Sequence, residues 1–189
     1  MKEDTLYILG DYLDRGPDSI CVIDLIRTLQ NENYQIYGLL GNHEYMLIEE
    51  LKHNVWPPGV AETLKSFGVS HNKEIAPEYV SWLQSLDYYI EVDGYILVHA
   101  GLNFDTQDPF SQKYDMLWVR GWYEKINRAW LGNRIIIHGH TPIQSHEIKK
   151  MHDQLDHDQV LNIDNGCAFE TEGLHQLCCF NLDTRALVF

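Results

Sequence analysis

Basic residues are scarce in this sequence: 14 lysines and arginines stand against 28 aspartates and glutamates, which gives a net charge of −14. Proteins that bind nucleic acid through its phosphates need clustered basic residues, so the charge argues against a nucleic-acid partner. Long apolar runs are also missing, and no signal-peptide-like apolar stretch follows Met1. We therefore expect no nucleic-acid partner, no membrane association and a cytoplasmic location.

Cysteine is sparse as well, and its spacing carries no recognisable pattern. The four cysteines form no Cys-x-x-Cys pair, which indicates neither a disulfide framework nor a zinc ribbon. The hydrophobic content of 44% and the charged content of 22% are ordinary for a globular protein. A chain of 189 residues is long enough to bury a core, and we expect one domain over residues 1–189.

The first forty residues alternate between strand and helix patterns. Residues 6–9 are a short apolar run typical of a buried strand, and residues 20–29 carry isoleucine and leucine at helical spacing. Residues 36–40 read as a second strand. Strands that alternate with helices favour a parallel sheet in an α/β protein.

The remainder predicts a helical insertion and further strands. Residues 46–86 look helical, with a break at Pro57-Pro58, and Asp93-Gly94 joins two strands of a hairpin. A strand is also expected at 135–137, and short strands near the end favour a second, antiparallel sheet. The fold class is therefore α/β, a two-sheet β-sandwich flanked by helices. The predicted hairpin and late strands are 89–92, 95–98, 160–163, 177–180 and 186–189.

Four polar clusters each follow one of the predicted strands. Loops after strands are where α/β folds assemble their ligand sites. The clusters combine carboxylate, amide and imidazole groups, a donor set that suits Mn, Fe or Zn. They are Gly10-Asp11-Tyr12-Leu13-Asp14-Arg15-Gly16, Gly41-Asn42-His43-Glu44, His99-Ala100-Gly101 and His138-Gly139-His140-Thr141-Pro142.

These clusters resemble the signature blocks of the calcineurin-like metallophosphoesterases, most closely the small bacterial and phage serine/threonine protein phosphatases. The spacing of 31 residues between Asp11 and Asn42 is specific to that pattern. The resemblance implies a metal-dependent phosphomonoester hydrolase, a serine/threonine or dual-specificity protein phosphatase that uses direct attack by metal-activated water. Its partner would be a phosphoprotein or a small phosphoester, and its metal Mn²⁺, with Fe or Zn as alternatives.

The resemblance also implies a role for individual metal-binding residues. Asp11 resembles the carboxylate that bridges two metals. The remaining ligands of the second metal would be Asn42, His99 and His140. His138 lies just beside this pattern, and we expect it to support the site rather than to bind metal.

Four further residues match the catalytic and phosphate-binding positions of the family. His43 resembles the histidine that protonates the leaving oxygen, and Asp14 would hold it. Arg15 and Arg120 match the two phosphate clamps, and a guanidinium can bind two phosphate oxygens at once. Glu44 would give structural support only.

One block of the family is missing from this sequence. No Asp-x-His precedes Asp11, and only ten residues stand before it. We expect a chain that lacks its first strand–loop–helix unit, holds one metal instead of two and turns over weakly. Two alternatives stay open: a symmetrical dinucleoside-tetraphosphate hydrolase, and a one-metal binding protein without activity.

Overall fold

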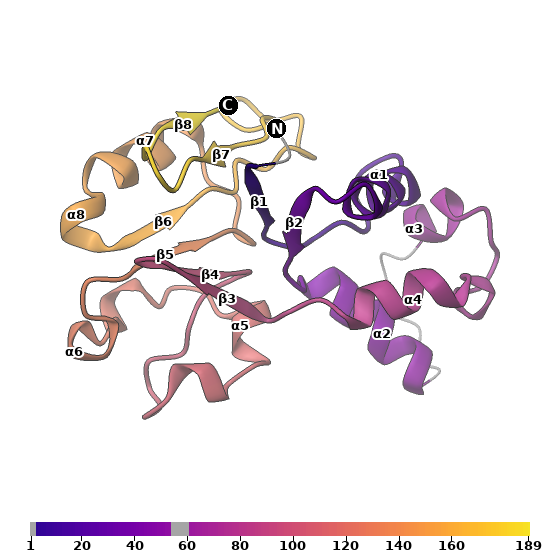
Figure 1. Ribbon diagram of the computed structural model, residues 1–189, viewed down its shortest axis with the longest axis horizontal. Coiled ribbons are helices and arrows are strands. Elements are labelled where there is room, and N and C mark those ends of the chain that lie inside the picture. Colours follow the sequence, from indigo (N-terminus) through magenta and orange to yellow (C-terminus); the bar gives the residue numbers. More distant parts are fainter. Residues whose placement is uncertain (1–2, 54–60) are drawn as a thin grey trace. The chain divides into compact units, whose positions relative to one another are not determined.

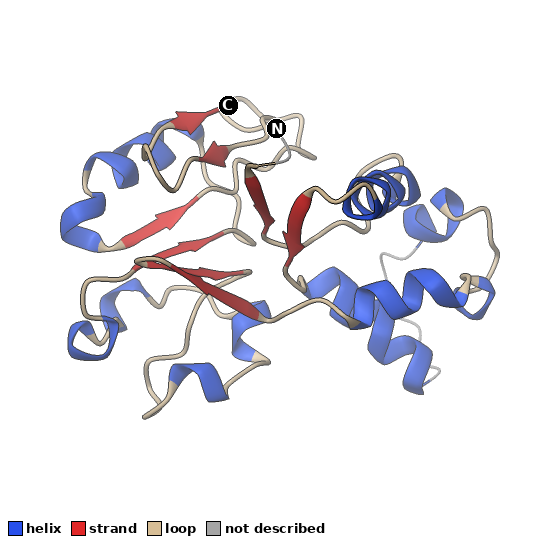
Figure 2. Ribbon diagram, in the orientation of Figure 1, coloured by secondary structure: helices blue, strands red, loops and turns tan. Residues whose placement is uncertain are grey.

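The computed structural model describes residues 3–53 and 61–189, and it is a mixed α/β structure (Figure 1 and Figure 2). The chain divides into two compact units, Met1–Asp87 and Tyr88–Phe189. In the described part of the chain, every helix is too short or too polar to cross a membrane.

The first unit opens with a strand–helix–strand arrangement, as its sequence pattern predicts, but the first strand is exposed or half-buried instead of buried. Strands β1 (Thr5–Ile8) and β2 (Gln35–Gly38) pair in parallel, and α1 (Ser19–Asn31) connects them. The Asp18 side chain caps α1 by accepting a hydrogen bond from the backbone N–H of Cys21 at 3.2 Å. The loop that leaves β1 therefore runs straight into the first turn of a helix.

Four helical segments complete the described part of the first unit, and Figure 1 shows α1 to α4 gathered in it. They confirm the predicted helical insertion, although the first of them begins at Asn42 instead of near residue 46. The predicted break at Pro57-Pro58 lies outside the described residues. The segments are α2 (Asn42–His53), α3 (Ala61–Ser66), the 3₁₀ turn η1 (Asn72–Glu74) and α4 (Pro77–Gln84).

The second unit contains a four-stranded sheet in the order β3-β4-β5-β6. Strands β3 (Tyr89–Val92) and β4 (Tyr95–Val98) form the predicted hairpin, and β5 (Ile135–His138) pairs with β4 in parallel. Every residue of β4 and β5 is buried, which explains why both strands are apolar up to His138 at the end of β5. Strand β4 ends directly before His99, and β5 ends at His138, the first residue of the next histidine-containing block.

The prediction for the last third of the chain is wrong in one respect. Strand β6 (Val160–Asn162) joins the four-stranded sheet in parallel with β5 rather than an antiparallel second sheet. Two helices, α7 (Ser145–Asp153) and α8 (Leu155–Asp158), supply the crossover that a parallel pair needs. Only β7 (Cys179–Phe180) and β8 (Leu187–Val188) form the expected antiparallel pair.

A tryptophan-rich segment between β4 and β5 folds into short helical turns. Met116 and Trp122 from this segment are buried against Ile96 and Ile136 of the sheet. The segment is thus part of the core of the second unit, and it is seated against the block that follows β4. Its turns are η2 (Pro109–Ser111), α5 (Asp115–Trp118), η3 (Tyr123–Lys125) and α6 (Arg128–Leu131).

Candidate functional site

In the first unit, the carboxylate of Glu44 organises the loop that carries Asp11. Glu44 is fully buried, and its Oε2 accepts hydrogen bonds from the backbone N–H groups of Asp11 and Gly41, both at 2.9 Å. Its Oε1 accepts from Tyr12 at 2.8 Å and from Leu13 at 3.0 Å. Burial raises the pKa of Glu44 to about 7, while these N–H donors oppose the shift. The role is structural support, as the sequence suggested.

The backbone of this loop is held in an unusual conformation. Asp11, Asp14 and Arg15 have φ values of 59°, 62° and 52°, in the left-handed region that L-residues rarely adopt. Each such residue costs about 1–3 kcal/mol, and the four N–H bonds to Glu44 help to offset that cost. Gly41 must be glycine, because a Cβ there would lie 2.4 Å from the backbone nitrogen of Asp11.

His43 lies in the first turn of α2 and is oriented by Asp14. Its Nδ1 lies 2.6 Å from Oδ2 of Asp14, and its Nε2 lies 4.0 Å from Oδ2 of Asp11. Thr63 donates a hydrogen bond to the other oxygen of Asp14, so that both carboxylate oxygens are engaged. Burial lowers the pKa of His43, but the Asp14 hydrogen bond and the charge of Asp11 outweigh it and raise the pKa overall.

Two other predicted residues flank this arrangement. Asn42 is buried at the first position of α2, directly before His43. Arg15 is exposed, and its positive charge lowers the pKa of His43, which opposes the rise caused by the carboxylates. The first unit thus brings together Asp11, Asp14 and His43, with Asn42 and Arg15 as their chain neighbours.

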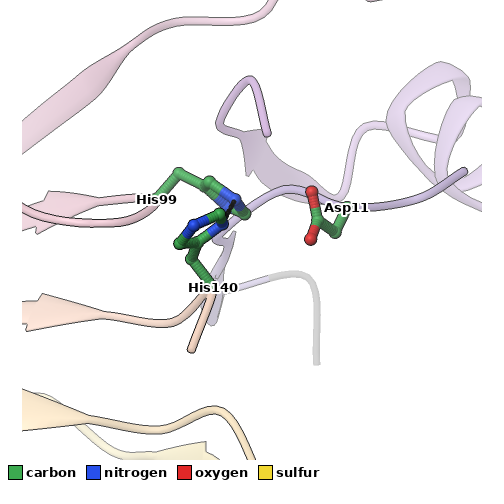
Figure 3. Close-up of side chains that lie close together, drawn as sticks. All are labelled: Asp11, His99 and His140. Carbon is green, nitrogen blue, oxygen red and sulfur yellow. Dashed lines mark hydrogen bonds between the residues drawn. The ribbon is translucent and has the colours of Figure 1, made fainter. Parts of the chain in front are cut away.

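In the second unit, the imidazoles of His99 and His140 face each other. His99 Nε2 lies 3.2 Å from His140 Nδ1, and the two rings meet edge to face at 68° (Figure 3). Both residues are buried. Metal–nitrogen bonds of about 2.0–2.1 Å place two ligands of a tetrahedral ion about 3.3 Å apart, so the pair fits a shared divalent metal.

The loops that carry these two histidines are anchored by the tryptophan-rich segment and by β6. Trp122 donates its indole N–H to Ala100 O at 3.2 Å and packs so closely on Gly101 that no Cβ would fit there. Asn162 donates a hydrogen bond to Thr141 O at 2.8 Å. The Asn162 bond anchors the backbone directly after His140, whose φ of 71° is again in the left-handed region.

His138 is occupied by protein groups on both ring nitrogens. Its Nε2 lies 2.8 Å from the Tyr123 hydroxyl, and its Nδ1 lies 3.0 Å from Gly139 O. Burial lowers its pKa to about 4, so the ring is neutral. The arrangement agrees with a supporting role for His138.

Arg120 reaches the same block of the second unit from the tryptophan-rich segment. Its Nη1 donates a hydrogen bond to Thr141 Oγ1 at 3.1 Å, and the side chain is otherwise exposed. The guanidinium therefore contacts the residue that directly follows His140. An exposed fork of N–H donors in this position can bind a phosphate.

Each unit carries donors that suit a divalent metal. Figure 3 draws the three side chains that each offer one ligand atom, namely the Asp11 carboxylate of the first unit and the His99 and His140 imidazoles of the second. Carboxylate oxygen and imidazole nitrogen together bind Mn, Fe or Zn. The 3.2 Å between His99 Nε2 and His140 Nδ1 also fits two ligands of one such metal.

Sequence reasoning missed three residues that support the site: Thr63, Tyr123 and Asn162. Thr63 lies 49 residues from Asp14, and its neighbours in the sequence carry no motif. Tyr123 and Asn162 act by hydrogen bonding to the block around His140, and only the three-dimensional pairing reveals them. The one signal available in the sequence was His138 itself, because a histidine that supports a site needs hydrogen-bond partners.

Comparison with known proteins identifies a family over nearly the whole chain. The sequence model of the calcineurin-like phosphoesterase family matches residues 1–182. An asymmetrical bis(5′-nucleosyl)-tetraphosphatase of Bacillus velezensis is 25% identical over an alignment of 189 positions that spans 89% of this chain and 72% of that protein. A symmetrical bis(5′-nucleosyl)-tetraphosphatase of Nitrosomonas europaea is 26% identical over an alignment of 157 positions that spans 76% of this chain and 52% of that protein.

Solved structures share the fold. A crystal structure attributed to a diadenosine tetraphosphatase matches with a TM-score of 0.65 and 18% identity, over 98% of this chain and 79% of its own. The cold-active protein-tyrosine phosphatase of a psychrophilic Shewanella species matches with a TM-score of 0.60 and 19% identity, over 90% and 63%. The α/β fold expected from the sequence is confirmed.

Proposed function

The chain belongs to the calcineurin-like phosphoesterase family, a family of hydrolases, and we propose that it hydrolyses dinucleoside tetraphosphates with the help of a divalent metal. One observation carries this choice of substrate: the relatives matched over most of the chain are named bis(5′-nucleosyl)-tetraphosphatases. The sequence motifs favour a protein phosphatase, with a symmetrical dinucleoside-tetraphosphate hydrolase as an alternative. The relatives support the alternative better.

The metal would be held by Asp11, Asn42, His99 and His140. Asp11 follows β1 and Asn42 begins α2, whereas His99 and His140 come after the buried strands β4 and β5. Hydrogen bonds from or to Glu44, Trp122 and Asn162 hold the backbone at or beside these residues. When bound, a divalent ion supplies Lewis-acid activation of a phosphate oxygen and of the attacking water. Manganese is our first expectation, and the same donors also suit iron or zinc.

The two arginines would hold the polyphosphate chain. A tetraphosphate bridge carries several negative charges, whereas the protein itself has a net charge of −14. Favourable binding therefore depends on local cations. Arg15 lies four residues after Asp11 and Arg120 contacts the residue after His140, and both guanidinium groups are exposed. Their planar N–H forks fit phosphate oxygens better than a lysine would.

His43 would donate a proton to the leaving oxygen, and Asp14 would keep the imidazole oriented and charged. The raised pKa of His43 favours the protonated form that this step needs. The leaving group of a phosphoanhydride is itself a phosphate, which needs less proton assistance than an alkoxide. We therefore expect His43 to matter less for dinucleoside tetraphosphates than for alkyl phosphates.

The test is hydrolysis of diadenosine tetraphosphate by the full chain with Mn²⁺, with products separated by ion-exchange chromatography. Two ADP molecules would mark symmetrical cleavage, and ATP with AMP would mark asymmetrical cleavage. A phosphoserine peptide serves as the competing substrate, and Asp11→Asn is the control for contaminating hydrolases. Faster turnover of the peptide than of the dinucleotide, measured as kcat/KM, would overturn the proposal in favour of a protein phosphatase.

A further inference from the structure

Two aromatic side chains of the second unit lead outward from the imidazole of His140. The Trp118 ring centroid lies 6.1 Å from that of His140, with an interplanar angle of 82°. The Tyr114 ring lies 6.1 Å from Trp118 at an angle of 31°, and Tyr114 is 58% exposed. We propose that Tyr114 and Trp118 form a stacking surface for a nucleobase of the substrate, an inference that rests on the proposed function.

This surface is continuous with the groups proposed to bind phosphate. Arg120 follows Trp118 by two residues and donates a hydrogen bond to Thr141, the neighbour of His140. One short segment thus carries both the aromatic rings and a guanidinium. Trp118 packs against His140 and Arg120 contacts the next residue, so a nucleotide whose phosphate binds Arg120 would direct its base toward these rings.

The segment that carries this surface is anchored in the core of the second unit. Met116 and Leu117, between the two aromatic residues, are fully buried. Met116 O accepts a hydrogen bond from the backbone N–H of Ala100 at 2.8 Å, which ties α5 to the loop that carries His99. A preorganised aromatic surface loses little entropy when a ligand binds, so its contacts translate well into affinity.

Burying the side chain of Trp118 carries a free-energy cost that packing alone does not explain. Its indole N–H is buried and has no hydrogen-bond partner among the described residues. A buried donor without a partner costs about 1–3 kcal/mol, and phenylalanine would fill much of the space without that cost. The wide indole face therefore has a use other than stability, and stacking against a base is a use that needs width.

A nucleobase is the occupant that the proposed substrate supplies. Bases stack on aromatic rings regardless of sequence, and each such contact is worth about 1–3 kcal/mol. A dinucleoside tetraphosphate carries one base at each end of its phosphate chain. The surface would bind one of them and leave the other free.

The experiment compares ATP with inorganic tripolyphosphate, which has the same phosphate chain and no nucleoside. Isothermal titration calorimetry with Mn²⁺ measures the Kd of each for wild type, Tyr114→Ala, Tyr114→Phe and Trp118→Phe. Tyr37→Ala is the matched control, because Tyr37 is also an exposed tyrosine, at 47%, and lies on β2. Thermal unfolding of every variant accompanies the titrations.

We expect Tyr114→Ala to weaken ATP binding about tenfold and tripolyphosphate binding less than twofold. Tyr114→Phe and Tyr37→Ala should bind ATP like wild type, because the ring and not the hydroxyl stacks. Trp118→Phe should weaken ATP binding without lowering the unfolding temperature. Equal losses for both ligands, or a wild type that binds ATP no more tightly than tripolyphosphate, would overturn the stacking surface.

The outcome is separable from that of the proposed function. Absence of dinucleotide turnover together with a Tyr114-dependent preference for ATP would contradict the tetraphosphatase assignment and leave the base-binding surface intact. Turnover of the dinucleotide with a KM unchanged by Tyr114→Ala would contradict the surface alone.

Discussion

The Nδ1 atom of His43 lies 2.6 Å from Oδ2 of Asp14, and the other oxygen of that carboxylate accepts a hydrogen bond from Thr63. Asp14 lies in the loop after β1, His43 in the first turn of α2 and Thr63 in α3. A carboxylate fixed at both oxygens can orient an imidazole and stabilise its charged form. This chain of contacts makes His43 the best-placed proton donor of the first unit.

The His43→Asn variant should therefore retain its metal. Its kcat should fall most for substrates whose leaving group needs a proton. With an alkyl phosphate we expect kcat to fall by about 10²–10⁴, and with p-nitrophenyl phosphate much less, because nitrophenolate leaves without a proton. Steady-state kinetics on both substrates and metal analysis of the purified variant provide the measurement. The same loss on both substrates would assign His43 another role.

Arg120→Ala should raise KM and lower kcat for every phosphate substrate while the metal content stays unchanged. The guanidinium is exposed and tethered only to Thr141 among the hydrogen bonds of the described residues, so its removal leaves the fold intact. Arg120→Lys should restore little, since an ammonium group cannot bind two oxygens in one plane. The control is Arg185→Ala, which removes an exposed arginine paired with Asp156. Unchanged kinetics in Arg120→Ala would place the phosphate contact elsewhere.

The sequence predicted those parts of the fold that are encoded locally. Residues 5–38 form strand, helix and strand because each pattern is short and complete, and Asp93-Gly94 defines its own hairpin. The pairing of β6 depends on α7 and α8, whose polar residues from 145 to 158 obscured the crossover. A strand pattern does not reveal which neighbour it will pair with.

The site was predictable where a motif carried it and hidden where a long-range contact did. His43 and Asp14 lie 29 residues apart, and the resemblance alone joined them before the structure did. Thr63 is a single hydroxyl with no periodicity around it. Its contribution became visible only once α3 was placed beside the first loop.

Glu44→Ala should destabilise the protein strongly and disorder the loop that carries Asp11. Four backbone N–H groups would lose their acceptor, at about 1–3 kcal/mol for each one that stays buried. Glu44→Gln retains one acceptor oxygen and should cost less. Urea unfolding monitored by tryptophan fluorescence gives the free energies, with Glu62→Gln on the exposed side of α3 as the control. A loss below about 1 kcal/mol in Glu44→Ala would contradict the supporting role.

A second buried carboxylate, Glu50, makes the stability of the protein depend on pH. Glu50 is 3% exposed, its Oε1 has no hydrogen-bond partner among the described residues, and Asn72 donates to its Oε2 at a long 3.5 Å. Burial, reinforced by the charge of Asp14, raises its pKa from 4.5 to about 7. Between those two values the folded protein keeps a proton that the unfolded chain releases.

Stability should therefore fall as pH rises from about 4.5 through 7, by up to about 1.4 kcal/mol per pH unit from this group. Glu50→Gln carries no titrating proton, so its free energy of unfolding relative to wild type should increase from pH 5 to pH 8. Subtracting the two curves removes every titration that they share, that of Glu44 included. Urea unfolding at four pH values measures the difference. Because glutamine can also donate to Asn72 Oδ1, a constant offset is expected, and only a difference that does not change with pH would contradict a neutral Glu50 in the folded state.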